Sequence, residues 1–402
     1  MIHSFSCKNF YSFDGLTTVD FVVNEKAPDN YGYFTTSAKS RLSKVETVIG
    51  SNASGKTNLL KVLPFLKWII TESFNIDPKA GLPVKSFMFG EKENEPIELS
   101  AVFEISGNIY TYHFALDDKK ILSEELKVKN KSNKKTTSKK IFSRHWDNSA
   151  KKYILDDKNF HLPKGFENSL RPNASVVSVA VRLGHNESDE VFNYWKKIET
   201  NVSEAGWIGD RLLPYATHQI FEALDFYSNN DSLKKEAEKL LSRFDLGLSG
   251  FDIKREKTEE GFTLKARAVH SVGGKKYPLN LNYESSGTKQ LFVLLKTILL
   301  VLTNGGVAVL DEFDVNLHPE MVTALFDLFI DKNTNPKNAQ LLFSSHSHRV
   351  LNKLDKYQII FTEKNDKGKS EAWRMDDMSG IRADDNYYAK YVAGAYGAVP
   401  KL

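Results

Sequence analysis

One stretch of the sequence decides the fold: Gly50-Ser51-Asn52-Ala53-Ser54-Gly55-Lys56-Thr57, residues 50–57. It matches the phosphate-loop pattern G-x-x-x-x-G-K-[ST]. The apolar segment 45–49 precedes it, and residues 58–71 follow with apolar side chains at helical spacing. In such a loop the glycines let backbone N–H groups turn toward a phosphate, and the next helix adds its positive end. We therefore predict a strand, a phosphate-binding loop and a helix.

The residue types in this loop indicate ATP and Mg²⁺ as cofactors. We expect Lys56 to reach the β- and γ-phosphates and the Thr57 hydroxyl to bind Mg²⁺. The residues that we expect to contact the nucleotide are Asn52, Ala53, Ser54, Gly55, Lys56, Thr57 and Asn58.

A second segment supplies the acids that a phosphate loop needs. Residues 306–312, GVAVLDE, read as an apolar strand that ends in Asp311 and Glu312. We expect Asp311 to hold Mg²⁺ through its water shell. Glu312 is then placed to take a proton from the attacking water.

Two further segments narrow the class. In ESSGTKQ, residues 284–290, a Ser-Gly pair opens a helix and so forms an anion site, yet within one chain it has no phosphate to bind. In LFSSHS, residues 342–347, His346 follows a strand and is able to contact the γ-phosphate or the water. We assign Glu312 and His346 as the candidate catalytic residues.

The order of these motifs resembles the ABC-type ATPases of the SMC/RecF/OLD group. The resemblance lies in KNFYSF (residues 8–13), the phosphate loop, SSGT (285–288), DEFDVNLHP (311–319) and SSH (344–346). Within that group the chain most resembles the stand-alone ATPases of anti-phage abortive-infection systems, the AbiLi/RloA type, and residues 382–400 resemble their ending. The matching motifs cover about residues 1–115 and 280–402.

The resemblance implies an α/β fold: an ABC-type ATPase head, with a P-loop mixed sheet and an antiparallel β subdomain, that carries an inserted β/helical lobe. Residues 1–120 and 271–402 would form the head. Residues 121–270 would form the inserted lobe, a basic β-hairpin region followed by helices.

The resemblance also implies a head-to-tail homodimer, or a higher oligomer, with composite ATP sites. Ser285, Ser286 and Gly287 of one subunit would close on the γ-phosphate held by Lys56 of the other. Lys8 and Asn9 would lie near the nucleotide, and the loop 314–319 would couple the two sites. One departure is that no glutamine occurs between Lys56 and Gln219, so the usual glutamine-loop residue is missing.

Composition bounds the class of protein. The 402 residues include 41% hydrophobic and 26% charged residues, enough for a sizeable core. A single cysteine, Cys7, excludes a disulfide framework and a cysteine-built metal site. No signal peptide is apparent, and the apolar stretch 291–302 is too short to cross a bilayer. We expect a cytoplasmic protein with no membrane partner.

The net charge of +4 hides a basic segment, Lys127 to Lys152, which holds ten basic residues and one acid. It reads either as the solvated tip of a hairpin or as a patch that contacts a nucleic-acid backbone. A GTPase is disfavoured, because the N-K-x-D sequence at 352–355 does not follow an apolar strand and the D-x-x-G sequence at 377–380 comes after it.

Two functions then remain open. The first is a defence ATPase that senses infection, hydrolyses ATP slowly and holds or controls a separately encoded effector of nuclease type. The second is a RecF-like DNA-binding repair or clamp ATPase. Four tyrosines of the C-terminal stretch either face a partner or pack on the protein's own sheet; they are Tyr387, Tyr388, Tyr391 and Tyr396.

Overall fold

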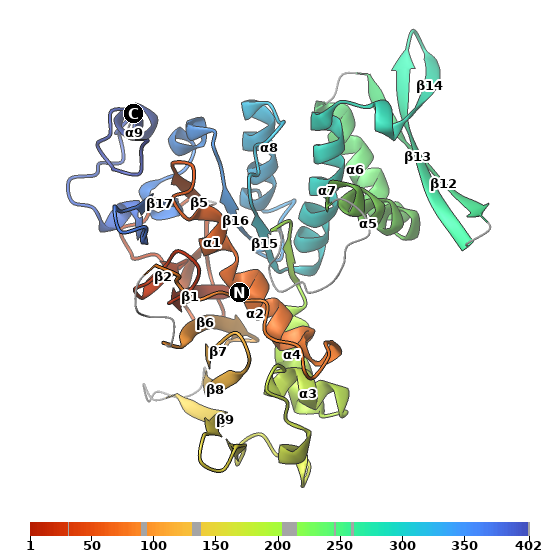
Figure 1. Ribbon diagram of the computed structural model, residues 1–402. Helices are drawn as coiled ribbons and strands as arrows, with labels where there is room; N and C mark the ends of the chain where they lie inside the picture. Colours follow the sequence, from red (N-terminus) through yellow and green to blue (C-terminus); the bar gives the residue numbers. More distant parts are fainter. Residues whose placement is uncertain are drawn as a thin grey trace.

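A six-stranded sheet forms the centre of the computed structural model, which describes residues 1–30, 32–89, 95–130, 138–202, 215–244, 247–258 and 261–400 (Figure 1). Its strands lie in the order β11-β15-β16-β5-β17-β18. They are β11 (Ile198–Thr200), β15 (Val307–Leu310), β16 (Gln340–Ser344), β5 (Val45–Gly50), β17 (Ile359–Lys364) and β18 (Ser370–Arg374). The first five run parallel, and β18 pairs antiparallel with β17. The carboxyl ends of β5, β15 and β16 therefore meet at one edge.

Helices cover both faces of this sheet, because its central strands are apolar on both sides. On one face lie α1 (Lys56–Leu60) and α2 (Val62–Thr71), which share a core with Val307 and Val309. On the other face lie α7 (Ser286–Asn304) and α8 (Pro319–Ile330), which share a core with Ala308 and Leu310. The period-2 alternation along β15 thus separates two cores.

A seven-stranded antiparallel sheet packs against the α2 side of the molecule (Figure 1). Its order is β10-β9-β8-β7-β6-β1-β2. The strands are β1 (Ile2–Lys8), β2 (Thr17–Asp20), β6 (Ile97–Ile105), β7 (Asn108–Leu116), β8 (Ile121–Lys129), β9 (Lys139–Asp147) and β10 (Lys152–Asp156). Between β2 and β5 in the sequence, β3 (Tyr33–Thr35) and β4 (Arg41–Ser43) form a short antiparallel hairpin.

This sheet runs across the boundary that we expected at residue 120. β8 pairs with β7 over most of its length, so residues 121–156 extend the sheet that begins with β1. After them, α3 (Val176–Arg182) and α4 (Asp189–Trp195) pack on the first core, and β11 joins the central sheet. The division at residue 120 remains a prediction, and the strand pairing gives no break there.

The part of the chain that projects furthest is a helical and β arm (Figure 1). It contains α5 (Tyr215–Asn229) and α6 (Asp231–Phe244), followed by β12 (Leu248–Thr258), β13 (Gly261–Val272) and β14 (Lys275–Asn280). α5 and α6 pack on α7 through the second core. The arm therefore leads directly into the start of α7.

α7 has the length and composition of a membrane-spanning helix, the one such helix in the described residues, with a mean hydropathy of 1.3. Its apolar side chains, however, belong to the second core, where Leu291, Leu295 and Ile298 are fully buried. Burial between the sheet and the arm accounts for this apolar sequence.

The C-terminal tyrosines pack mainly inward. Tyr387 and Tyr391 lie on the buried side of α9 (Tyr387–Val392), and Tyr396 is buried as well. The rings of Tyr391 and Tyr396 stack on Phe361 of β17, with centroids 5.7 and 5.6 Å away. Tyr388 alone of the four is exposed. Three of the four tyrosines therefore complete the core and do not form an exposed aromatic face.

Candidate active site

The phosphate loop connects β5 to α1 as the sequence predicts, and its backbone needs glycine at two positions. Gly55 has φ +113°, in the left-handed region, and a Cβ there would lie 2.4 Å from the hydroxyl of Ser370. A Cβ at Gly50 would lie 2.3 Å from the carbonyl oxygen of Thr362. β17 and β18 thus press against the loop and fix its shape.

Lys56 is buried at the base of the loop. Its ammonium donates to the carbonyl oxygens of Gly50 and Ser51, at 2.9 and 3.0 Å. Burial lowers the pKa of Lys56, and the charges of Asp311 and its neighbours oppose that shift. The side chain therefore lies folded over its own loop, next to the acids.

Asp311 is held at the end of β15 by contacts from three other elements. Its carboxylate accepts hydrogen bonds from Thr57 Oγ1 at 2.7 Å and from Ser344 Oγ at 2.5 Å. Asn201 accepts from the backbone N–H of Asp311 at 2.7 Å and donates to its carbonyl oxygen at 2.9 Å. The parallel strands β11, β15 and β16 bring these residues together because their carboxyl ends share one edge.

Glu312 follows with an unusual backbone. Its φ is +48°, which few residues other than glycine adopt, and its N–H donates to Ser344 Oγ at 2.8 Å. Its side chain is 60% exposed, and Oε1 lies 4.0 Å from Nε2 of His346. The strained turn directs the carboxylate into open space instead of the core.

Asp314 orients the histidine. Its carboxylate accepts from the backbone N–H groups of His346 and Ser347, at 3.0 and 2.6 Å. The turn after β16 is therefore tied to the turn after β15, and His346 and Glu312 face each other across the gap between them.

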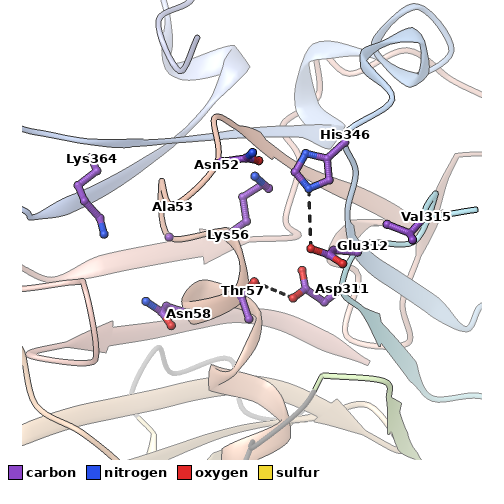
Figure 2. A pocket seen from close by; sticks show the side chains of 11 residues that line it. Asn52, Ala53, Lys56, Thr57, Asn58, Asp311, Glu312, Val315, His346 and Lys364 are labelled. Carbon is purple, nitrogen blue, oxygen red and sulfur yellow. Dashed lines mark hydrogen bonds and ion pairs between the residues drawn. The ribbon is translucent and has the colours of Figure 1, made fainter. Parts of the chain in front are cut away.

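These side chains line one cavity of about 720 Å³ (Figure 2). Its lining residues are Asn52, Ala53, Gly55, Lys56, Thr57, Asn58, Asp311, Glu312, Val315, His346 and Lys364. A volume of this size accommodates a nucleotide. The structure thus brings together most of the predicted loop residues, both acids and His346.

The remaining predicted site residues lie elsewhere. Ser54 is buried and its hydroxyl bonds to that of Thr362, 2.8 Å away. Lys8 pairs with Glu98 at 2.8 Å, and the buried Asn9 bonds to the backbone of Glu95 and Phe87. Neither Lys8 nor Asn9 lines the cavity.

Ser285, Ser286 and Gly287 form the start of α7 and do not line this chain's cavity. The Ser285 hydroxyl caps the helix by accepting from the N–H of Thr288 at 3.0 Å. A Cβ on Gly287 would lie 2.6 Å from the carbonyl oxygen of Asn316, so this helix start rests on the loop 314–319.

The oxygen donors at the centre of the cavity fit Mg²⁺. A hydroxyl and a carboxylate, Thr57 Oγ1 and Asp311 Oδ2, already lie within 2.7 Å of each other. Magnesium is held in proteins by one or two such oxygens together with water and substrate phosphates. Thr57 and Asp311 are the residues that would hold it.

Two residues of the site carry no motif that the sequence analysis used. Asn201 follows β11, a strand of three residues within a region read as helical. Lys364, at the end of β17, adds a second cation to the cavity. Their common signal is position at the carboxyl end of a strand of the central sheet, which requires the strand order to be known.

In the basic segment 127–152, some cations are buried or paired and others are exposed. Residues 131–137 of the segment lie outside the described part. Arg144 is fully buried, with its guanidinium 2.8 Å from the carboxylate of Glu124. Lys127 and Lys140 pair with Glu125 and Asp156. The lysines that remain exposed are Lys129, Lys139, Lys151 and Lys152. Arg144 therefore does not belong to a surface patch, in contrast to the sequence-based interpretation.

A family model described as "AAA domain, putative AbiEii toxin, Type IV TA system" matches residues 47–352. This range includes the phosphate loop, both acids and His346. A comparison with curated proteins finds no match.

Among solved structures, the chain is similar to the SMC head domain from Thermotoga maritima, with 16% identity, coverage of 93% of this chain and 98% of that chain, and a TM-score of 0.43. It is similar to an SmcHead bound to the C-winged helix domain of ScpA, with 14% identity, coverage of 94% and 99%, and a TM-score of 0.48. A Smc head domain with an extended coiled coil, bound to the C-terminal domain of ScpA derived from Pyrococcus furiosus, shares 13% identity, with coverage of 94% and 97% and a TM-score of 0.44.

Proposed function

This chain belongs to the AAA_21 family of AAA domains, and from that premise we propose that it binds ATP with Mg²⁺ at the phosphate loop and hydrolyses it slowly. We further propose that the chain acts in the cytoplasm as a homodimer that holds or controls a separately encoded, nuclease-type effector in anti-phage defence.

One observation carries the ATPase proposal. The phosphate-loop residue Thr57 contacts Asp311, and the next residue, Glu312, extends its carboxylate into the same cavity. Asp311, the proposed metal ligand, and Glu312, the proposed proton acceptor, are thus adjacent in the chain at the end of β15. This is the arrangement that phosphoryl transfer to water requires, where catalysis consists of positioning and charge stabilisation.

The residues divide the work as follows. Lys56 leaves its loop carbonyls to bind the phosphates of ATP, and the loop N–H groups surround them. Mg²⁺ held by Thr57 and Asp311 would neutralise charge on the phosphates. Glu312 takes the proton of the attacking water, while His346, 4.0 Å away, helps to hold that water beside the γ-phosphate.

Replacing Glu312 by glutamine tests this assignment. Glutamine keeps the size of the side chain but accepts no proton, so we expect turnover to fall about 10²–10⁴-fold while ATP still binds. Phosphate release and nucleotide-dependent thermal stabilisation measure the two effects separately. Lys56→Ala is the matched variant, which we expect to lose the stabilisation itself. Wild-type turnover in the Glu312→Gln protein would remove Glu312 from the role.

The start of α7 supports a site shared between two subunits. Ser286 and Gly287 are placed at a helix N-terminus but line no part of their own chain's cavity. Mixing Lys56→Ala subunits with Ser286→Arg subunits should restore one intact composite site in each mixed dimer. We expect partial recovery of hydrolysis. A mixture as inactive as either parent contradicts the shared site.

The effector proposal rests on the family and on the resemblance of residues 382–400. The tyrosines of that stretch add little support, because three of the four are buried. The exposed remainder is Tyr388 and Val392 on the outer side of α9. Co-expression with the product of the adjacent gene, followed by affinity purification, should recover a complex. Tyr388→Ala with Val392→Asp should weaken that complex and leave hydrolysis unchanged, since both side chains lie on the surface.

The RecF-like alternative is favoured by four exposed lysines of the described residues: Lys129 on β8, Lys139 on β9, Lys151 before β10 and Lys152 at its start. If it holds, the protein binds DNA with an affinity that falls steeply as salt is added. Reversal of these four charges should then abolish DNA binding while the complex with the neighbouring gene product, if any forms, is unaffected. Recovery of that complex without measurable DNA affinity favours the effector proposal.

A further inference from the structure

A second cavity lies at the opposite end of the central sheet from the phosphate loop. Its volume is about 860 Å³, and its lining residues are Asp29, Asn30, Tyr33, Phe34, Thr35, Arg41, Lys44, Lys332, Asn335, Pro336 and Asn338. Lys44 immediately precedes β5, whereas the phosphate loop follows it. The six residues of β5 span about 20 Å, and the two cavities share no lining residue.

The lining of this cavity is positively charged. Three segments each contribute one cation: Arg41 from β4, Lys44 from the turn before β5, and Lys332 from the loop between α8 and β16. The one acid in the lining is Asp29, whose side chain is fully exposed and lies 3.9 Å from Arg41. Such an exposed pair cancels little of the charge inside the cavity.

Lys44 is the least expected of the three. The residue is only 1% exposed, and its ammonium donates one hydrogen bond, at 3.2 Å, to the carbonyl oxygen of Ile330. Among the described residues no carboxylate lies within ion-pair distance of it. An ammonium has three donors, and a buried cation without an anion costs free energy. Burial and the charge of Lys332 both lower the pKa of Lys44, and Asp331 opposes them.

The walls around these cations are fixed in place. The Arg41 guanidinium donates to the carbonyl oxygens of Ala27 and Pro28, at 2.7 and 2.6 Å, and lies 5.2 Å from the ring centre of Tyr33. The buried Asn335 bonds to Phe329 and Ala339, which closes the loop before β16. Hydrogen bonds therefore hold Arg41 on one side of the cavity and the loop that carries Lys332 on the other.

We propose that this cavity binds a small phosphorylated anion, of the size of a nucleoside diphosphate, between Arg41, Lys44 and Lys332. Three cations on a preformed concave surface supply the charge that a diphosphate needs, and the half-buried Phe34 offers an apolar wall. The site is separate from the phosphate loop. A ligand there would contact the amino end of β5, the strand whose carboxyl end leads into the phosphate loop.

The experiment uses the full chain with Lys56→Ala, which removes the principal phosphate contact of the first cavity. Isothermal titration with ADP and, separately, with inorganic tripolyphosphate should show saturable binding that survives this change. Adding Lys44→Met should weaken it at least tenfold, because methionine keeps the buried stem and loses the charge. Lys337→Ala, an exposed change in the same loop outside the cavity lining, should leave the dissociation constant unchanged.

Three results would overturn the proposal: no saturable binding in the Lys56→Ala protein, the same affinity with methionine at position 44, or binding of a single-stranded oligonucleotide only. If the Lys44→Met protein does not fold, Lys332→Ala replaces it, since that residue is exposed. We expect this second variant to reduce the affinity at least threefold. Binding here is independent of hydrolysis at Glu312, so the two proposals fail separately.

Discussion

The two large sheets of this protein differ in how their charged residues are arranged. At the carboxyl edge of the six-stranded sheet, Lys56, Asp311 and Glu312 meet with spare donors and acceptors around a cavity. In the seven-stranded sheet, Glu124 and Arg144 lie opposite each other on β8 and β9 and satisfy each other inside the core. Parallel strand ends bring charges together without pairing them, whereas an antiparallel ladder places opposite charges face to face. The first arrangement calls for a ligand and the second stabilises the fold.

Of the three changes, Arg144→Ala should have the largest effect, a loss in the free energy of unfolding. The change leaves Glu124 buried without its cation, and breaking such a pair costs about 3–5 kcal/mol in the free energy of unfolding. Urea unfolding monitored by circular dichroism measures that loss. The double variant Arg144→Met with Glu124→Gln should recover much of it, since neither side chain is then charged. A loss below about 1 kcal/mol in Arg144→Ala would mean that the pair is not structural.

Asn201→Ala should act on the other sheet, and on turnover more than on stability. Asn201 holds the backbone of Asp311 through two hydrogen bonds, so its loss frees the carboxylate that we propose holds Mg²⁺ to move. We expect hydrolysis to fall about tenfold, the equivalent of about 1.4 kcal/mol. The matched control is Asn173→Ala, which removes two hydrogen bonds from this buried amide to the backbone carbonyls of Asp77 and Ala80, outside the cavity lining. It should lower the melting temperature without changing turnover of the folded protein, and equal turnover in both variants would contradict the role of Asn201.

Glu46 fits neither of these two arrangements. It is an acidic residue of the central sheet that, in the part of the chain that the structure describes, neither lines a cavity nor pairs with a cation. It is fully buried on β5, and neither carboxylate oxygen has a hydrogen-bond partner among the described residues. Burial raises the pKa of Glu46 well above its ordinary value, although Arg374 opposes this. The folded state therefore keeps the proton that the unfolded state loses above about pH 4.5, and stability falls as the pH rises from there toward the folded pKa.

Glu46→Gln removes that dependence and should give the smallest effect of the three. We expect no change in melting temperature at pH 4 and an increase of a few degrees at pH 8, measured by scanning fluorimetry at both values. Glu371→Gln, an exposed position on β18, is the control that should shift neither. An equal increase at pH 4 and pH 8 would assign the effect to packing instead of the proton.

The sequence predicts the parts of the site whose signal is local. Each of its main parts ends or follows a strand, and its residue types indicate the chemistry that it can perform. These parts are the phosphate loop, Asp311, Glu312 and His346. Asn201 could not be found in this way, because β11 has only three residues and its partner β15 lies more than a hundred positions later.

Other features depend on which side of an element faces the core. Spacing places Tyr387 and Tyr391 on one side of α9 but does not say that Phe361 covers that side. Arg144 counted as a surface cation until β8 brought Glu124 opposite to it. Lys8 and Asn9 precede a turn in which Ser12 accepts a hydrogen bond from Asn58, next to the phosphate loop. Their own bonds to Glu98 and Phe87 nevertheless hold them outside the cavity lining.

The left-handed backbone at Glu312 has a consequence for how such a protein changes over generations. Glycine adopts a φ of +48° without strain, so Glu312→Gly should relieve the turn after β15 while it removes the carboxylate that we propose as the proton acceptor. At this position the more stable sequence is the inactive one, a trade-off between stability and activity that recurs at functional sites. If Glu312 has the proposed role, selection for hydrolysis keeps a carboxylate there against the backbone strain.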